Sequence, residues 1–86
     1  MRITEVRITP FESNTLKAFA SITIEDALVV DGFKVLEGND GPFVVMPSKQ
    51  TKEGKFINTA YPIKKEVREL VKTEVLNAYN ASIKAD

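Results

Sequence analysis

The chain has 86 residues, enough for one domain and too few for two. It contains no cysteine and no histidine, which excludes disulfides, thiolate nucleophiles and the two commonest zinc-binding side chains. Its 12 basic and 12 acidic side chains cancel overall, but residues 1–46 hold four Lys/Arg against seven Asp/Glu, whereas residues 47–72 hold seven against three.

The first predicted strand runs from Arg2 to Pro10 and is rich in Ile, Val and Thr. Val6 and Ile8 share one face while Ile3 lies on the other, and this break in alternation indicates an edge strand or a bulge. The segment has no long apolar run, so we expect neither a signal peptide nor a membrane span, and we predict a cytoplasmic protein.

Two further strands form a predicted antiparallel hairpin. Apolar residues occupy every second position from Leu16 to Ile24, which is the clearest strand pattern in the chain. A short turn at residues 25–27 leads into a strand from Leu28 to Leu36, and we expect Val29, Phe33 and Val35 to line its buried side. The sequence Gly38-Asn39-Asp40-Gly41-Pro42 then predicts a tight turn, because Asn and Gly tolerate positive φ.

The next segments are a short apolar run and a polar, lysine-rich stretch. Residues 43–46 (FVVM) show no polar alternation, so we expect this strand to be covered on both faces. Residues 48–55 are polar, and Gly54 is expected to turn the chain back into a brief final strand at Phe56 and Ile57.

One helix is predicted, from about Lys64 to about Lys84. At 100° per residue its expected core-facing stripe is Val67, Leu70, Val71, Val75 and Ala78. Leu76 and Ile83 project from nearly the opposite side. They are either singly exposed aliphatic side chains, which are common, or part of a second covered face. We favour the second interpretation, in which Leu76, Tyr79 and Ile83 form the interface of a homodimer.

The residues offer little for catalysis. The acidic side chains are scattered without the spacing of a calcium loop, and no glycine-rich phosphate loop is present. Ser48 and Lys49 are adjacent, but neighbouring side chains on an extended backbone point apart, so a Ser–Lys dyad is not supported. We therefore expect no enzyme, no metal, no cofactor and no small-molecule substrate.

The basic stretch favours a polyanion as partner. Lysines and arginines neutralise phosphates and release counterions, which gives affinity with little contact to base edges. Lysines at a helix start oppose the macrodipole, so Lys64 and Lys65 have no structural advantage there. The alternative is a solvated surface with locally clustered lysines. The predicted nucleic-acid-binding residues are Ser48, Lys49, Gln50, Thr51, Lys52, Lys55, Lys64, Lys65 and Arg68.

Several segments carry a resemblance to a known family: ITEVRI at residues 3–8, ASITIEDALVVDGFKVLEGNDGPFVVMPSK at 20–49, GKF at 54–56, PI at 62–63 and VLNAY at 75–79. With these segments the chain resembles the stage V sporulation protein G (septation protein SpoVG) family over nearly its whole length. The resemblance implies a small dimeric α+β domain with an antiparallel sheet and a C-terminal helix. It also implies site-selective DNA and RNA binding that regulates septation, sporulation onset or virulence-type programmes.

Matched residue by residue, Ser48, Lys49 and Thr51 agree with the basic loop of the family. Gln50 stands where the family usually has Arg, and Lys52 where it tends to have Pro. Lys55 replaces an acidic residue, so the charge is partly restored by different residues. These departures affect sequence preference more than phosphate affinity, because Gln cannot make the bidentate contacts of Arg.

We therefore predict a single α+β domain over residues 1–86, with an antiparallel sheet of about five strands followed by one helix. The expected function is that of a dimeric regulator that binds DNA or RNA. The rival hypothesis is a protein-interaction module of the division machinery that uses an exposed strand edge or the face with Leu76 and Ile83. Neither hypothesis involves a membrane.

Overall fold

The computed structural model describes residues 1–11 and 13–84 and has the predicted α+β architecture. Four antiparallel strands form one sheet in the order β1-β2-β3-β4, and two short strands form a separate hairpin. A single helix follows. The elements are β1 (Ile3–Pro10), β2 (Leu16–Ile24), β3 (Leu28–Gly38), β4 (Gly41–Val45), β5 (Ser48–Gln50), β6 (Phe56–Asn58) and α1 (Lys65–Lys84).

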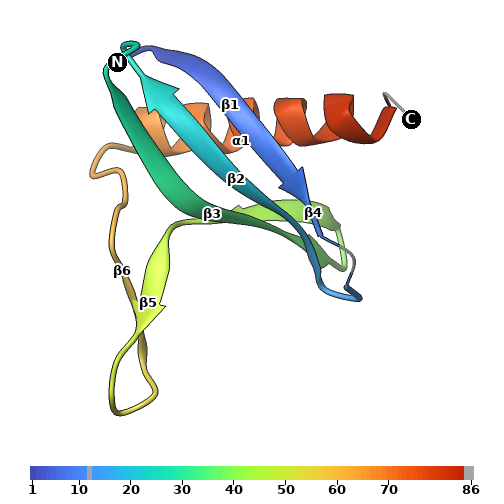
Figure 1. Ribbon diagram of the computed structural model, residues 1–86, viewed down its shortest axis with the longest axis vertical. Coiled ribbons are helices and arrows are strands. Elements are labelled where there is room, and N and C mark those ends of the chain that lie inside the picture. The colour runs from blue at the N-terminus through green and yellow to red at the C-terminus, as the bar shows by residue number, and fades with distance from the viewer. Residues whose placement is uncertain (12, 85–86) are drawn as a thin grey trace.

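The helix α1 lies across one face of the four-stranded sheet, while the β5–β6 hairpin extends away from both (Figure 1). The core fills the space between helix and sheet, where alternate strand residues face the apolar side of the helix. No residue of the hairpin belongs to this core. The buried core residues are Ala18, Ala20, Ile22, Phe33, Val35, Val44, Val71, Val75 and Tyr79.

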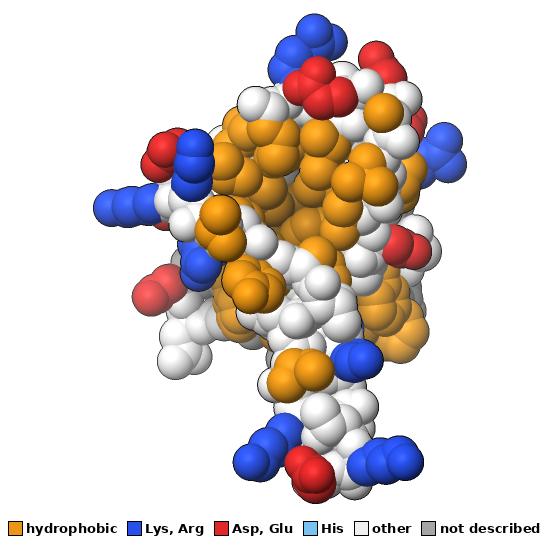
Figure 2. Space-filling model, turned by 90° about the vertical axis from the view of Figure 1, so that its left-hand side faces the viewer, with side chains coloured by type: hydrophobic (Ala, Val, Ile, Leu, Met, Phe, Trp, Pro, Cys, Tyr) orange, Lys and Arg blue, Asp and Glu red, His pale blue; other side chains and the backbone are white. Residues whose placement is uncertain are grey.

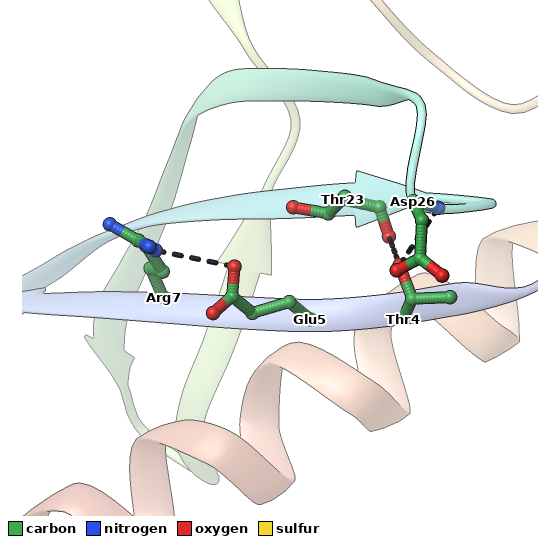
Figure 3. Close-up of polar contacts among 5 residues, drawn as sticks. All are labelled: Thr4, Glu5, Arg7, Thr23 and Asp26. Atoms are coloured by element: carbon green, nitrogen blue, oxygen red, sulfur yellow. Dashed lines mark hydrogen bonds and ion pairs between the residues drawn. The ribbon is translucent and has the colours of Figure 1, made fainter.

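The edge strand β1 carries the irregularity that its sequence predicts. Its pairing with β2 shifts register between Ile3 and Glu5. Because the extra residue reverses the alternation, Ile3 packs against the core together with Val6 and Ile8. Glu5 and Arg7 face outward and form an ion pair at 3.3 Å, which contributes little to stability because both side chains are more than half exposed (Figure 3).

The predicted β2–β3 hairpin is present, and β1 braces its turn. Glu25 and Asp26 both have φ of 54°, the left-handed conformation of a type I′ turn, without a glycine at either position. The Thr4 hydroxyl accepts a hydrogen bond from the Asp26 N–H at 3.1 Å and donates one to the Thr23 carbonyl at 3.3 Å (Figure 3). The Glu25 carboxylate accepts a further bond from the Arg2 N–H at 2.8 Å. These contacts tie the turn to the sheet edge.

The predicted buried side of β3 is wrong at its first half. Val29 is 62% exposed, and Val30 packs against the core in its place. The cause is a bulge: the register with β2 shifts by one residue where Gly32 takes φ of +95°. The Asp31 carboxylate accepts a hydrogen bond from the Gly32 N–H at 2.8 Å. An extra residue at this point moves the preceding side chains to the other face.

The strand β4 is also less covered than its apolar sequence predicts. Its pairing with β3 closes at Gly38 and Gly41, which confirms the predicted turn. However, β4 is an edge strand with the helix on one face only. Val44 is consequently buried, whereas Phe43 remains 46% exposed, so the expectation of cover on both faces is wrong.

The helix is confirmed at almost the predicted bounds, but its buried stripe is rotated. The stripe is centred on Val75, with Val71 one turn before and Tyr79 one turn after. Leu76 flanks this stripe and packs against the core, so the prediction that it projects away is wrong. Leu70, expected in the stripe, is half-buried and lies outside the core. Including Tyr79 among the apolar positions would have given the observed centre.

Candidate functional site

The β5–β6 hairpin contains most of the predicted site residues. Buried Pro47 ends the preceding segment, and the ladder pairs Ser48 with Asn58, Lys49 with Ile57 and Gln50 with Phe56. The Thr59 N–H donates to the Pro47 carbonyl at 2.8 Å and thereby closes the base of the hairpin. The structure confirms the brief final strand at Phe56 and Ile57.

The tip of the hairpin is an ordered turn. The Thr51 N–H donates to the Lys55 carbonyl at 2.7 Å, and the Lys55 N–H donates back to the Thr51 hydroxyl at 3.2 Å. Gly54 takes φ of +86°, a conformation that favours glycine. The Gln50 side-chain amide donates to the Gly54 carbonyl at 3.3 Å. The loop backbone is thus held by its own residues rather than by the core.

The lysines of this hairpin are exposed and available to a partner. Lys49, Lys52 and Lys55 all lie at the surface, and within residues 1–11 and 13–84 none forms an ion pair with a carboxylate. The nearest acidic residue in sequence, Glu53, lies in the same turn without pairing to them. A phosphate that contacts these ammonium groups would therefore not have to displace a carboxylate partner.

The second predicted group lies at the start of α1. Lys64, Lys65 and Arg68 are exposed. The Arg68 N–H donates to the Lys64 carbonyl at 3.0 Å, which is the first helical hydrogen bond, and the Arg68 guanidinium donates to the Pro62 carbonyl at 3.4 Å. Arg68 thus holds the segment that enters the helix, in addition to carrying charge.

The hairpin and the helix start do not merge into one cluster. The hairpin tip points away from the sheet, while α1 begins beside the sheet after a connecting segment (Figure 1). On the face seen in Figure 2, the Lys and Arg side chains at the bottom are separated from those at the left by hydrophobic and uncharged surface. Any ligand that contacts both groups must therefore span the surface between them.

The predicted dimer residues have unequal environments. Tyr79 is buried in the core of its own chain, and Leu76 is half-buried against that core. Ile83 is 52% exposed and is the one free apolar side chain of the three. A partner subunit at this face would therefore contact Ile83 most directly.

Two features of the structure do not follow from the sequence. The first is an apolar groove of about 140 Å³ whose lining includes Ile22, Phe33, Val71 and Tyr61, and hydrophobic side chains gather around this hollow in Figure 2. The second is the exposure of Phe56, at 68%. The groove depends on how separate elements pack together, and an apolar strand residue such as Phe56 is usually expected to be buried, so neither feature is visible in the sequence.

Within the described part of the chain, no three His, Cys, Asp or Glu side chains gather closely enough to hold a metal ion. The only helix described there, α1, is not apolar enough to cross a membrane.

The arrangement defines a small α+β domain in which one helix packs on a four-stranded antiparallel sheet and a cationic hairpin projects from it. The family model described as SpoVG matches residues 1–81. The chain belongs to the SpoVG family.

Relatives from several bacteria support this assignment. A protein of Bdellovibrio bacteriovorus named "Putative septation protein SpoVG" is 39% identical over 99% of this chain and 79% of its own length. Proteins of the same name from Caldicellulosiruptor saccharolyticus and Staphylococcus carnosus are 40% and 41% identical. The first of these two covers 99% of this chain and 98% of its own length, and the second covers 93% and 76%.

Proposed function

We propose that the protein is a non-catalytic regulator of septation that acts by binding DNA or RNA, with the β5–β6 hairpin as its main phosphate contact. The observation that carries this proposal is the projecting hairpin with three exposed lysines and no described carboxylate paired to them. Lysines in this state release condensed counterions when they meet a polyanion, which favours association. The names of the relatives support the link to septation.

The helix start is proposed as a second contact rather than as an extension of the first. Lys64 and Lys65 follow the hairpin after a connecting segment and have no carboxylate partner within the described residues. A nucleic acid that crosses the face in Figure 2 could reach both groups. A homodimer would double the number of such contacts, which raises affinity through effective concentration.

The test compares two variants with the same change in net charge. One combines Lys49→Ala, Lys52→Ala and Lys55→Ala; the control combines Arg2→Ala, Arg7→Ala and Lys17→Ala, which lie on or beside the first two strands. Fluorescence anisotropy with labelled duplex DNA and RNA is measured between about 50 and 200 mM salt. Both variants lower the net charge by three, so only local contact distinguishes them.

We expect the hairpin variant to lose affinity and the control to retain most of it. The slope of log affinity against log salt should fall by about 0.9 for each lysine that contacts a phosphate of duplex DNA. Equal losses in both variants would indicate an effect of net charge alone and would contradict the hairpin as the site. Absence of binding by the unmodified protein to every DNA and RNA tested would contradict nucleic-acid binding altogether.

A protein-interaction module is the second candidate, and the apolar groove is the observation that favours it. Tyr61 and Ile63 stand exposed on the segment before the helix, at 60% and 89%. A protein partner that covers them would remove apolar surface from water. Two results together would support this candidate instead: the unmodified protein binds no nucleic acid, and the Tyr61→Asp variant, changed at a residue that lines the groove, loses a partner protein of the division machinery.

A further inference from the structure

Phe56 is the most exposed of the aromatic side chains in the chain, at 68%, and it stands on the hairpin that carries the cations. It takes no part in the core. Most of the ring surface is in contact with water, so its apolar face is not covered by other residues of the chain. Next to a set of exposed cations, that face offers a partner both apolar and ionic contacts at one place.

The ring shares its side of the hairpin with uncharged polar groups. Directly paired residues of an antiparallel ladder project to the same face, so Gln50 lies beside Phe56. Ser48 and Asn58, also paired, lie two residues further along on this face. Hydroxyl and amide groups of this kind can donate to and accept from the edges of a nucleobase.

The cations are placed around this face rather than on it. Lys49 pairs with Ile57 on the opposite side of the hairpin, and Lys52 lies in the tip. A two-stranded hairpin is thin enough for a lysine side chain, with its long aliphatic stem, to reach the border of the opposite face. An aromatic face bordered by cations matches a nucleotide, which presents a flat base next to a charged phosphate.

From this juxtaposition we propose that the Phe56 face of the hairpin is a stacking platform for an unpaired base, so that the preferred ligand is single-stranded nucleic acid. The inference rests on the proposed function and adds the class of nucleic acid to it. In a duplex both faces of each base are covered by neighbouring bases, and an aromatic ring can stack only on a base that is free. The lysines would contact duplex and single strand alike, whereas Phe56 distinguishes them.

The experiment measures anisotropy with an unstructured DNA oligonucleotide of about 15 nucleotides, within the range of single-strand site sizes, the RNA of the same sequence, and the corresponding DNA duplex. The variants are Phe56→Ala, Phe56→Tyr, which keeps the ring, and Ile57→Ala as the matched control on the opposite face of β6. We expect Phe56→Ala to weaken single-strand binding by about 5- to 150-fold. Duplex binding should change less than about twofold, Phe56→Tyr and Ile57→Ala should bind like the unmodified protein, and the salt slope should stay the same because the lysines remain.

A second measurement reports the contact itself. The chain has no tryptophan, so Phe56→Trp introduces a single indole at the proposed platform. Its fluorescence should be quenched when a single strand saturates the protein and should change little with the duplex. Unchanged emission at saturation would overturn the stacking proposal, as would a Phe56→Ala variant that weakens duplex and single strand equally.

The outcomes separate the two proposals. If the unmodified protein binds nucleic acid and Phe56→Ala binds single strands within twofold of it, stacking is refuted and the phosphate-binding function stands. If the unmodified protein binds neither single strands nor duplex, both proposals fall together. Far-UV circular dichroism should show that each variant folds, since residue 56 contributes nothing to the core.

Discussion

Substitution of Gly32 by alanine tests the bulge that determines which residues of β3 face the core. Gly32 has φ of +95°, and a Cβ added there would lie 3.3 Å from the Cβ of buried Pro47. The backbone conformation costs a non-glycine residue about 1–3 kcal/mol. Crowding against Pro47 adds about 1 kcal/mol, the lower end for an overfilled site. The smaller entropy of the unfolded alanine chain offsets about 0.4–1 kcal/mol of this.

The matched control is Gly41→Ala. Gly41 has φ of +111°, but no atom lies within 4 Å of the position that a Cβ would occupy there. It therefore carries the backbone cost without the contact. In urea unfolding followed by circular dichroism, both variants should be less stable than the unmodified protein, and Gly32→Ala should be the less stable of the two by about 1 kcal/mol.

Two results would refute this reasoning. Equal stabilities for the two variants would show that the approach of residue 32 to Pro47 costs nothing. A neutral surface change alters the free energy of unfolding by less than about 0.5 kcal/mol. If Gly32→Ala stays within this range of the unmodified protein, the bulge does not require positive φ at this position.

Three further changes probe the core, the braced turn and the predicted dimer. Tyr79→Ala should lower the free energy of unfolding by about 3–5 kcal/mol in urea, because its ring is buried in the core. Thr4→Val should lower it by about 1 kcal/mol, since the hydroxyl that joins Thr23 and Asp26 is lost while the shape is kept; an unchanged melting temperature would argue against the brace. Ile83→Asp should change the stability of one copy by less than about 0.5 kcal/mol, yet convert the predicted dimer to monomer in sedimentation velocity. A monomeric unmodified protein at micromolar concentration would remove the dimer prediction.

The sequence predicts those elements whose pattern is local. The alternation of β2 and the turn signals at residues 38–42 depend only on neighbours along the chain, and both are confirmed. Which residues of β3 face the core could not be predicted in the same way. Nothing in the sequence distinguishes Asp31 and Gly32 from other strand residues. The bulge becomes apparent only when β3 is paired with β2. One inserted residue then exchanges Val29 for Val30 on the core face.

The candidate site shows the same division between local and tertiary information. The basic character of the hairpin follows from its composition, and the return of the chain at Gly54 follows from turn chemistry. The structure has the predicted turn. The exposure of Phe56 does not follow, because an aromatic residue in a strand is expected to face a core. It depends on β5 and β6 pairing with each other rather than joining the main sheet.

This separation of hairpin from sheet also bears on how binding experiments are interpreted. The core residues come from β2, β3, β4 and α1, and none lies between residues 48 and 58. The turn at residues 51–55 is closed by its own hydrogen bonds. Changes to Lys49, Lys52 or Phe56 would therefore remove the proposed contacts with a ligand while the core packing that determines stability is left in place. A loss of affinity in these variants without a loss of stability identifies the hairpin as a binding element, whereas a parallel loss of both would mean that the hairpin contributes to the fold.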